Sequence, residues 1–299
     1  MSYHIVSIDS PQCSLTCRNG QLICRTEEGE KKLPLEDVAS IIITSFSATI
    51  HSQLFLEAAK QGVALIICET FRPVSLVLPA NRSTDTLLTR ALLKLTPQHV
   101  AQLWRTTIDA KCLNQLTLAE HLSPKDNGLE ALRNAAHSRK AHKEAICAKL
   151  FWQIYGRSQG EPSFVRERAQ DGLNSLLNYG YAVLSALCHR GLLVHGLLPQ
   201  LGVFHKPRFR SEPLVYDLME AFRPAVELML AEFMLEPDVS MKAWAKKVGT
   251  ELRERRVKHE AYTLKLMDAI DASANSLARA YEQMSAESFW VPELPLSPN

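Results

Sequence analysis

The chain has 299 residues, of which 46% are apolar and 22% are charged, and its formal net charge is +2. This composition supports a full hydrophobic core, and the length predicts two domains. The amino terminus lacks a signal-peptide pattern and no uncharged apolar run approaches the ~18 residues of a membrane span, so we expect a soluble, cytoplasmic protein without membrane contact.

Residues 1–80 predict a β-rich domain that contains one helix. Asn19-Gly20 between two apolar, β-prone runs is typical of a hairpin turn. The helix is expected over Ser52–Gln61, with Gly62 ending it. The expected strands are His4–Ile8, Ser14–Cys17, Leu22–Arg25, Ser40–Thr44, Val63–Cys68 and Val74–Leu78.

After a linker expected at 81–86, the apolar residues recur with a helical period, so residues 87–290 predict a larger all-α domain. The proline-rich tail 291–299 is expected to be disordered. The fold class is therefore α+β, with a sandwich-like β domain first. The expected helices are Leu87–Leu95, Val100–Leu118, Arg133–Tyr155, Asp171–Arg190, Pro213–Phe222, Pro224–Leu235 and Glu260–Met284.

Three acidic or imidazole side chains stand close together near residue 210. Asp217 and Glu220 are three residues apart, on one side of a helix, and His205 precedes them. Beside cationic residues, such a set suits a divalent cation that acts on phosphate. The alternatives are that His205 is a core or capping residue and that the two acids meet the helix dipole, and spacing alone leaves the choice open.

Glu144 has mostly small neighbours at helical spacing, among them Ala141, Cys147 and Ala148, which predicts that it is turned inward. Desolvating a carboxylate is costly unless a cation or a hydrogen-bond donor compensates. A buried ion pair with a distant Lys or Arg is one interpretation, and metal ligation is the other.

Basic residues concentrate in two runs, Arg133–Lys149 and Lys242–Lys258, whereas residues 1–80 hold 6 Lys and Arg against 8 Asp and Glu. A charge run is usually a solvated helix face, but two of them in one helical domain fit a phosphate-backbone surface. The candidate DNA contacts are Arg139, Lys143, Lys206, Arg208, Arg210, Lys242, Lys246 and Arg256.

Five segments of the chain, which include Glu144, His205, Asp217 and Glu220, resemble the family of CRISPR-associated integrases that insert new spacers into CRISPR arrays. The resemblance covers nearly the whole chain, and its length and the Asn81–Leu118 region look closest to the branch found with type II, Cas9-type systems. It is carried by LPLEDVASIIIT and GVALIICETFRPVSLVLP in the β-rich part, and by HKEAICAKLFWQIYG, DGLNSLLNYGYAVLSALCHRGL and GLLPQLGVFHKPRFRSEPLVYDLMEAFRP in the helical part.

The resemblance implies a metal-dependent DNA endonuclease and integrase of antiviral defence. Its metal ligands would be Glu144, His205 and Glu220, with Asp217 as a further catalytic acid. Carboxylate and imidazole ligands suit Mg²⁺ or Mn²⁺. The implied reaction is a transesterification, in which a DNA 3′-hydroxyl attacks the phosphodiester at the repeat boundary.

The resemblance also implies partners. These are double-stranded DNA, as prespacer and as CRISPR repeat, a second copy of the chain bound through the β domain, and a small second adaptation subunit in a heterohexamer-type complex. A Cas9-type effector is a further candidate, and Asn178 and Tyr179, which match the family's LN-aromatic motif, would support the active site. The alternative functions are a catalytically silent nucleic-acid-binding scaffold and a small-molecule metal hydrolase, the second of which leaves both basic runs unexplained.

Overall fold

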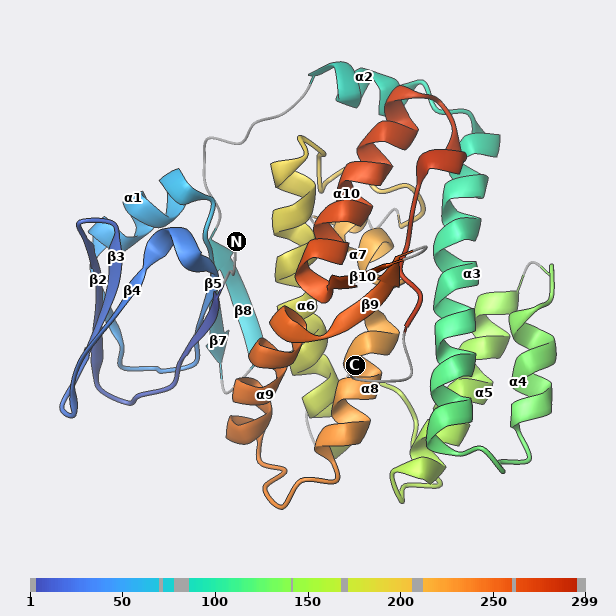
Figure 1. The fold of residues 1–299 in the computed structure, drawn as a ribbon, viewed down its shortest axis with the longest axis horizontal. Coiled ribbons are helices and arrows are strands. Elements are labelled where there is room, and N and C mark those ends of the chain that lie inside the picture. Colours follow the sequence, from blue (N-terminus) through green and yellow to red (C-terminus); the bar gives the residue numbers. More distant parts are fainter. Residues whose placement is uncertain are drawn as a thin grey trace.

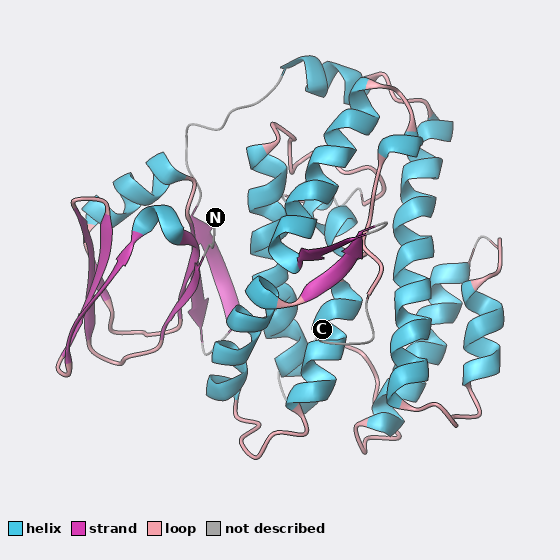
Figure 2. Cartoon of the chain, in the orientation of Figure 1, coloured by secondary structure: helices cyan, strands magenta, loops and turns pink. Residues whose placement is uncertain are grey.

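The computed structural model describes residues 4–69, 72–77, 86–140, 142–167, 172–205, 212–259 and 262–294. A strand-rich region up to Val77 is followed by a helical region from Thr86 onward, and the two lie side by side in Figure 1. The division is plain when the ribbon is coloured by secondary structure (Figure 2). The predicted α+β class and its order, strands before helices, are confirmed. Within the described ranges, no helix has both the length and the apolarity to cross a bilayer.

Two four-stranded sheets form the strand-rich region. In the first, ordered β1-β5-β7-β8, the first three strands are parallel and β8 is antiparallel to β7. The second has the order β4-β3-β2-β6. The strands of the first sheet are β1 (His4–Ile8), β5 (Val38–Ile43), β7 (Ala64–Glu69) and β8 (Arg72–Val77), and those of the second are β2 (Cys13–Arg18), β3 (Gln21–Thr26), β4 (Gly29–Pro34) and β6 (Thr49–Ile50).

The predicted hairpin turn and the predicted end of the first helix are both found in the structure. The β2–β3 hairpin turns at Asn19 and Gly20, whose φ angles of 52° and 72° are those of a tight hairpin turn. Helix α1 (Ser52–Gln61) ends at Gly62, which has a left-handed φ of 69°. Strand β4 was not predicted, because its GEKKLP sequence is exposed and charged and shows no apolar alternation.

Strand β5 takes part in two hydrophobic cores. Ile41 and Ile43 pack with α1 and the second sheet, whereas Ile42 belongs to the core of the helical region. Successive side chains of a strand point to opposite faces, so a continuous apolar run indicates a sheet covered on both sides. Helices α6 and α9 cover the second face.

The helical region surrounds α6, which contacts α7, α8, α9 and α10. Gly180 allows the close approach of α6 and α8, since a Cβ atom there would lie 2.5 Å from Val226 Cγ1. The helices are α2 (Thr86–Leu93), α3 (Pro97–Leu122), α4 (Leu129–Ala136), α5 (Lys143–Ser158), α6 (Gly172–Val194), α7 (Pro213–Met219), α8 (Arg223–Phe233), α9 (Met241–Glu254) and α10 (Leu266–Glu282).

Two predicted helices are wrong in extent. The expected Arg133–Tyr155 helix is divided into α4 and α5, which both pack on α3 (Figure 1). No Gly or Pro lies in this stretch, so no local helix breaker in the sequence predicted the division. The expected Glu260–Met284 helix begins instead at α10, after the hairpin of β9 (Arg256–His259) and β10 (Tyr262–Lys265).

The described part of the carboxyl-terminal segment, 291–294, is packed on the helical region. The backbone amide of Lys258 donates to the carbonyl of Glu293 at 3.0 Å. On α3, Asn114 Nδ2 donates to the carbonyl of Pro292 and Asn114 Oδ1 accepts from the amide of Leu294, both at 3.0 Å. The tail up to Leu294 is therefore ordered by specific hydrogen bonds, contrary to the expectation from its composition.

Candidate active site

The structure brings Glu144 and Glu220 together on one ammonium group. Glu144 lies in the first turn of α5, and Glu220 directly follows α7. Lys111 of α3 reaches both, with Nζ 2.8 Å from Glu144 Oε1 and 2.6 Å from Glu220 Oε2. Glu144 thus forms the ion pair with a distant lysine that was one of its two interpretations. The carboxylates of Glu144 and Glu220, both predicted as metal ligands, face the same point, Lys111 Nζ.

Glu220 is a buried carboxylate, only 6% exposed. Burial by itself would raise its pKa, but the charges of Arg223 and Lys111 outweigh this effect and the pKa of Glu220 is lowered. Arg223 Nε donates to Glu220 Oε1 at 2.8 Å. Glu220 Oε2 is buried, and its partner is the Lys111 ammonium at 2.6 Å. A cation therefore already occupies the position that this oxygen faces.

Asp217 holds the loop that carries His205. It is 4% exposed, and its Oδ2 accepts from the amides of Val203 and Phe204 at 2.6 and 3.0 Å. Its Oδ1 accepts from the His205 amide at 3.0 Å and pairs with His205 Nδ1 at 2.7 Å. Both oxygens of Asp217 are thus engaged by this loop and hold its backbone and the His205 ring in place.

The imidazole of His205 lies in the same electrostatic neighbourhood as the two glutamates. Its hydrogen bond with Asp217 raises the pKa of His205 against the effect of burial, and the charges of Glu220 and Glu144 raise it further. With Nδ1–H directed at Asp217, the ring presents Nε2 as its remaining nitrogen.

Aromatic packing fixes the same loop. The ring of Trp104, on α3, stacks on Phe204 at 4.1 Å between centroids and meets His205 edge-on at 5.6 Å. Gly202 permits the tight turn before them, because a Cβ atom there would lie 2.4 Å from the His205 carbonyl oxygen.

A buried layer lies behind Glu220. The guanidinium of Arg223 is 4.6 Å from the centroid of the Tyr181 ring, and the Tyr181 hydroxyl donates to Glu227 Oε1 at 2.7 Å. Burial raises the pKa of Glu227 to about 7, although the Tyr181 hydrogen bond and the charges of Lys111 and Arg223 act in the opposite direction. This carboxyl is therefore close to half protonated near neutral pH.

The two residues of the LN-aromatic motif point to different surroundings. Asn178 Oδ1 accepts from Arg166 Nη2 at 2.7 Å, and the Arg166 guanidinium lies 5.3 Å from the Tyr181 ring centroid, so Asn178 is linked to the layer behind Glu220. Tyr179 is buried where α6 meets the first sheet, and Ser7 of β1 is its hydrogen-bonding neighbour.

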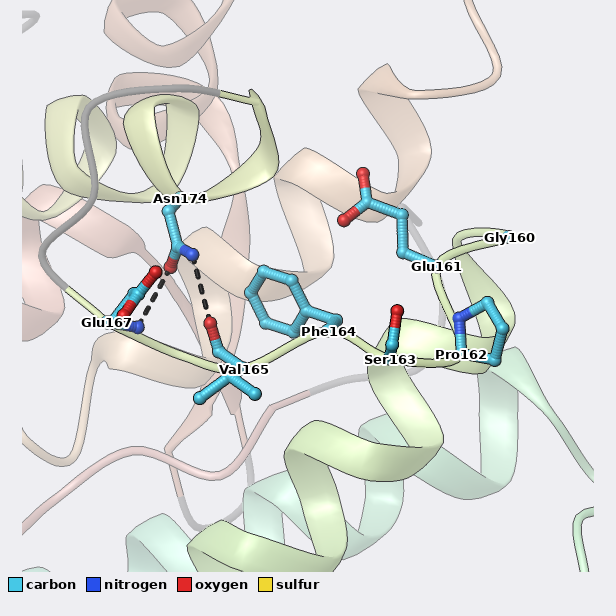
Figure 3. A pocket seen from close by; sticks show the side chains of 8 residues that line it. All are labelled: Gly160, Glu161, Pro162, Ser163, Phe164, Val165, Glu167 and Asn174. Atoms are coloured by element: carbon cyan, nitrogen blue, oxygen red, sulfur yellow. Dashed lines mark hydrogen bonds between the residues drawn. The ribbon is translucent and has the colours of Figure 1, made fainter.

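A hollow of about 510 Å³ lies on the segment between α5 and α6 (Figure 3). None of the four predicted catalytic residues lines it. Asn174 closes one side, donating to the Val165 carbonyl at 3.0 Å and accepting from the Glu167 amide at 3.2 Å. The presence of Glu161 and Glu167 in its wall does not suit a phosphate ligand.

The candidate DNA contacts differ in accessibility. Arg139, Lys246 and Arg256 are exposed, and Lys242 is exposed with only a 3.5 Å contact to Asp9 Oδ2. Lys143, in contrast, is buried, with Nζ 2.6 Å from Asp109 Oδ1, which makes it the weakest candidate. Lys206, Arg208 and Arg210 lie outside the described residues.

Sequence reasoning missed Lys111. A signal was present, because α3 carries four polar residues at helical spacing, and all four are buried. They are Thr107, Lys111, Asn114 and Gln115.

The residues present fit a divalent cation. Within the described ranges, no three His, Cys, Asp or Glu side chains are arranged closely enough to hold an ion. Glu144 and Glu220 nevertheless converge on one cation, the Lys111 ammonium, through Glu144 Oε1 and Glu220 Oε2. Two carboxylates and an imidazole nitrogen form a donor set suited to Mg²⁺ or Mn²⁺.

Comparisons with known proteins agree on one family. A family model described as "CRISPR associated protein Cas1" matches residues 6–254. The CRISPR-associated endonuclease Cas1 of Neisseria meningitidis serogroup C (strain 8013) is 28% identical over 297 residues, covering 94% of each chain.

Two solved structures share the fold. A "Casposase bound to integration product" has a TM-score of 0.76 at 19% identity and covers 95% of this chain and 91% of its own. A chain of a "Cas6-RT-Cas1--Cas2 complex" has a TM-score of 0.73 at 15% identity and covers 97% of this chain and 36% of its own.

Proposed function

The chain belongs to the family of CRISPR associated protein Cas1, and from this premise we propose that it is a metal-dependent DNA endonuclease and integrase that inserts new spacer DNA into a CRISPR array. The observation that carries the proposal is the convergence of Glu144 and Glu220 on one cationic point, with His205 oriented nearby by Asp217. The endonuclease name of the Neisseria relative and the integration product bound to the casposase support this reaction class.

The proposed reaction is a transesterification. The 3′-hydroxyl oxygen of the incoming DNA forms a bond to phosphorus at the repeat boundary, and the bond from phosphorus to the original 3′-oxygen breaks. One phosphodiester replaces another, so no nucleotide hydrolysis is needed. An ion held by Glu144, Glu220 and His205 would supply charge stabilisation at the phosphoryl and leaving oxygens.

The chain's own residues orient this chemistry. Asp217 accepts the Nδ1–H of His205, so the lone pair of the imidazole lies on Nε2. Arg223 fixes the Glu220 carboxylate through Oε1 and leaves Oε2 directed at the common point. The positive charges of Arg223 and Lys111 also favour the negative charge that develops on a reacting phosphate.

Partners follow from the same proposal. They are prespacer and repeat DNA, a second copy of the chain bound through the strand-rich region, and a small second adaptation subunit, which the likeness to a chain of a Cas1–Cas2 complex supports. The proposed DNA contacts are the exposed residues among the candidates, together with Lys206, Arg208 and Arg210. The proposal places the protein in the cytoplasm, which holds the array, while a Cas9-type effector and the type II branch stay predictions.

The test is a strand-transfer assay with a prespacer duplex and a plasmid that bears a CRISPR repeat. Wild-type protein is expected to insert the prespacer with Mg²⁺ or Mn²⁺ and to lose the activity in EDTA. Glu220→Gln is expected to lower insertion by roughly 100-fold or more while DNA binding is retained. Glu236→Gln, which changes an exposed acid paired with Lys247, is the matched control. Insertion that persists undiminished in EDTA would contradict the proposal.

One observation favours the scaffold as a second candidate: Lys111 and Arg223 already neutralise Glu144 and Glu220. A scaffold would bind the same DNA with equal affinity in Mg²⁺ and in EDTA, and the wild-type protein would insert nothing. The assay above therefore separates the two candidates with wild-type protein alone.

A further inference from the structure

Lys111 occupies the point at which the two glutamates meet, and its side chain is only 10% exposed. We propose that Lys111 is a built-in placeholder for the divalent ion. It holds Glu144 and Glu220 in position before the ion binds and gives up that point when the ion arrives. The inference rests on the proposed function, because it takes these two glutamates as ligands.

The first argument is competition for the same oxygen atoms. Lys111 Nζ lies 2.8 Å from Glu144 Oε1 and 2.6 Å from Glu220 Oε2. A Mg²⁺ ion binds carboxylate oxygens at about 2.1 Å, so an ion placed between these two oxygens would fall inside contact distance of the ammonium. The two cations therefore exclude each other from this position.

The second argument is that the acids need a cation even without the ion. Glu220 is buried, and a second carboxylate at the same point would repel it if nothing lay between them. The Lys111 ammonium lies between the two carboxylates, offsets their repulsion and holds them convergent. The carboxylate pair is thus preorganised for an ion.

The third argument is that buried acceptor oxygens without a partner among the described residues lie near Lys111 and could receive its ammonium after displacement. Gln115 follows Lys111 by one helical turn, on the same side of α3. Its Oε1 is buried and has no hydrogen-bond partner in the described part of the chain, and the same is true of Glu227 Oε2. Glu227 is close enough for the Lys111 charge to act on it. A flexible lysine side chain can satisfy these acceptors once it leaves the glutamates.

The test measures Mn²⁺ binding directly, by the loss of the electron paramagnetic resonance signal of free Mn²⁺. Lys111→Met keeps an unbranched side chain that is one atom shorter, and it removes the charge. The variant is expected to bind Mn²⁺ roughly 10-fold more tightly than the wild type, since the competing cation is gone. It is also expected to have a lower Tm without metal and a larger rise in Tm on adding Mn²⁺.

Arg255→Met is the matched control, because the Arg255 side chain is as buried as that of Lys111 and also bridges two acids, Glu232 and Glu251, which are not proposed ligands. It is expected to lower the Tm and leave the Mn²⁺ affinity unchanged. Should Lys111→Met fail to fold, Lys111→Arg supplies the measurement. Its permanently charged fork binds carboxylates more strongly, so Mn²⁺ binding is expected to weaken by roughly 10-fold.

The outcomes separate the two proposals. If the wild type binds Mn²⁺ and Lys111→Met binds it equally or more weakly, the placeholder proposal is wrong and the proposed function stands. The same holds if Lys111→Arg binds Mn²⁺ as tightly as the wild type. Absence of Mn²⁺ binding in the wild type and in every variant overturns both.

Discussion

Replacing Glu227 with Gln should change how the stability of the protein depends on pH. The Glu227 side chain is buried and carries a hydrogen bond from Tyr181 on one oxygen and no partner on the other among the described residues. Glutamine has the shape of the protonated acid and can accept the same hydrogen bond from Tyr181. The substitution therefore removes the ionisation while keeping the packing.

The size of the effect follows from the pKa. Burial raises the pKa of Glu227 from 4.5 to about 7 in the folded protein. Between these two values the folded state holds a proton that the unfolded state has released, so the free energy of unfolding falls as the pH rises. Because one pKa unit is equivalent to about 1.4 kcal/mol, the wild type should lose on the order of 3 kcal/mol between pH 4 and pH 8 through this group, and Glu227→Gln should lose none of it.

The assay is urea denaturation of both proteins at several pH values from 5 to 8. Other titrating groups affect both proteins alike, so the difference between the two unfolding free energies isolates Glu227. Glu227→Gln is expected to match the wild type at low pH and to exceed it by roughly 2–3 kcal/mol at pH 8. Parallel pH profiles would refute the reasoning, because they would mean that the carboxyl is ionised in the folded protein at the same pH as in the unfolded chain.

Two further substitutions test the loop that carries His205. Asp217→Asn should reduce strand transfer by roughly 10- to 100-fold with little change in DNA affinity, because its NH₂ group would face either His205 or the amides of Val203 and Phe204, all of which need an acceptor. The pKa of His205 is raised above 6.5, so the Asp217 pair contributes stability that is fully present below pH 6.5 and is lost as the pH rises through the folded value. Asp217→Asn should thus destabilise more at pH 6 than at pH 9 in denaturation experiments, and equal losses would contradict this account. Gly202→Ala should destabilise by about 1–3 kcal/mol in the same measurement, since its Cβ would meet the His205 carbonyl oxygen at 2.4 Å, whereas Gly249→Ala, whose Cβ would be 3.5 Å from Ile5, should be nearly neutral.

Much of the fold could be predicted where local chemistry decides it. The Asn19-Gly20 hairpin and the helix that stops at Gly62 depend on backbone angles that those residues favour, and both are found. Strand β4 could not be predicted, because an exposed edge strand needs no apolar pattern. The ordered tail depends on hydrogen bonds to distant α3, which no local window contains, and no Gly or Pro marks the break between α4 and α5.

The candidate site divides in the same way. Family resemblance predicted its acids and the imidazole, and their meeting depends on α3, α5 and the segment after α7. The distinct task of Asp217 could not be read from the sequence, because the three amides that it binds come together only in the folded loop. Lys111 was detectable in principle as a charged residue on the buried side of a helix, but its two partners lie on other elements.

The sharing of strand β5 between two cores has a mechanical consequence. Ile42 belongs to the core of the helical region, while Ile41 and Ile43 belong to the core with α1 and the second sheet, so one strand is packed into both halves. Moving the helices away from this sheet would expose Ile42, while Ile41 and Ile43 would stay covered by α1 and the second sheet. Such a motion costs apolar contacts of β5, so this strand couples the position of the sheets to that of the helices.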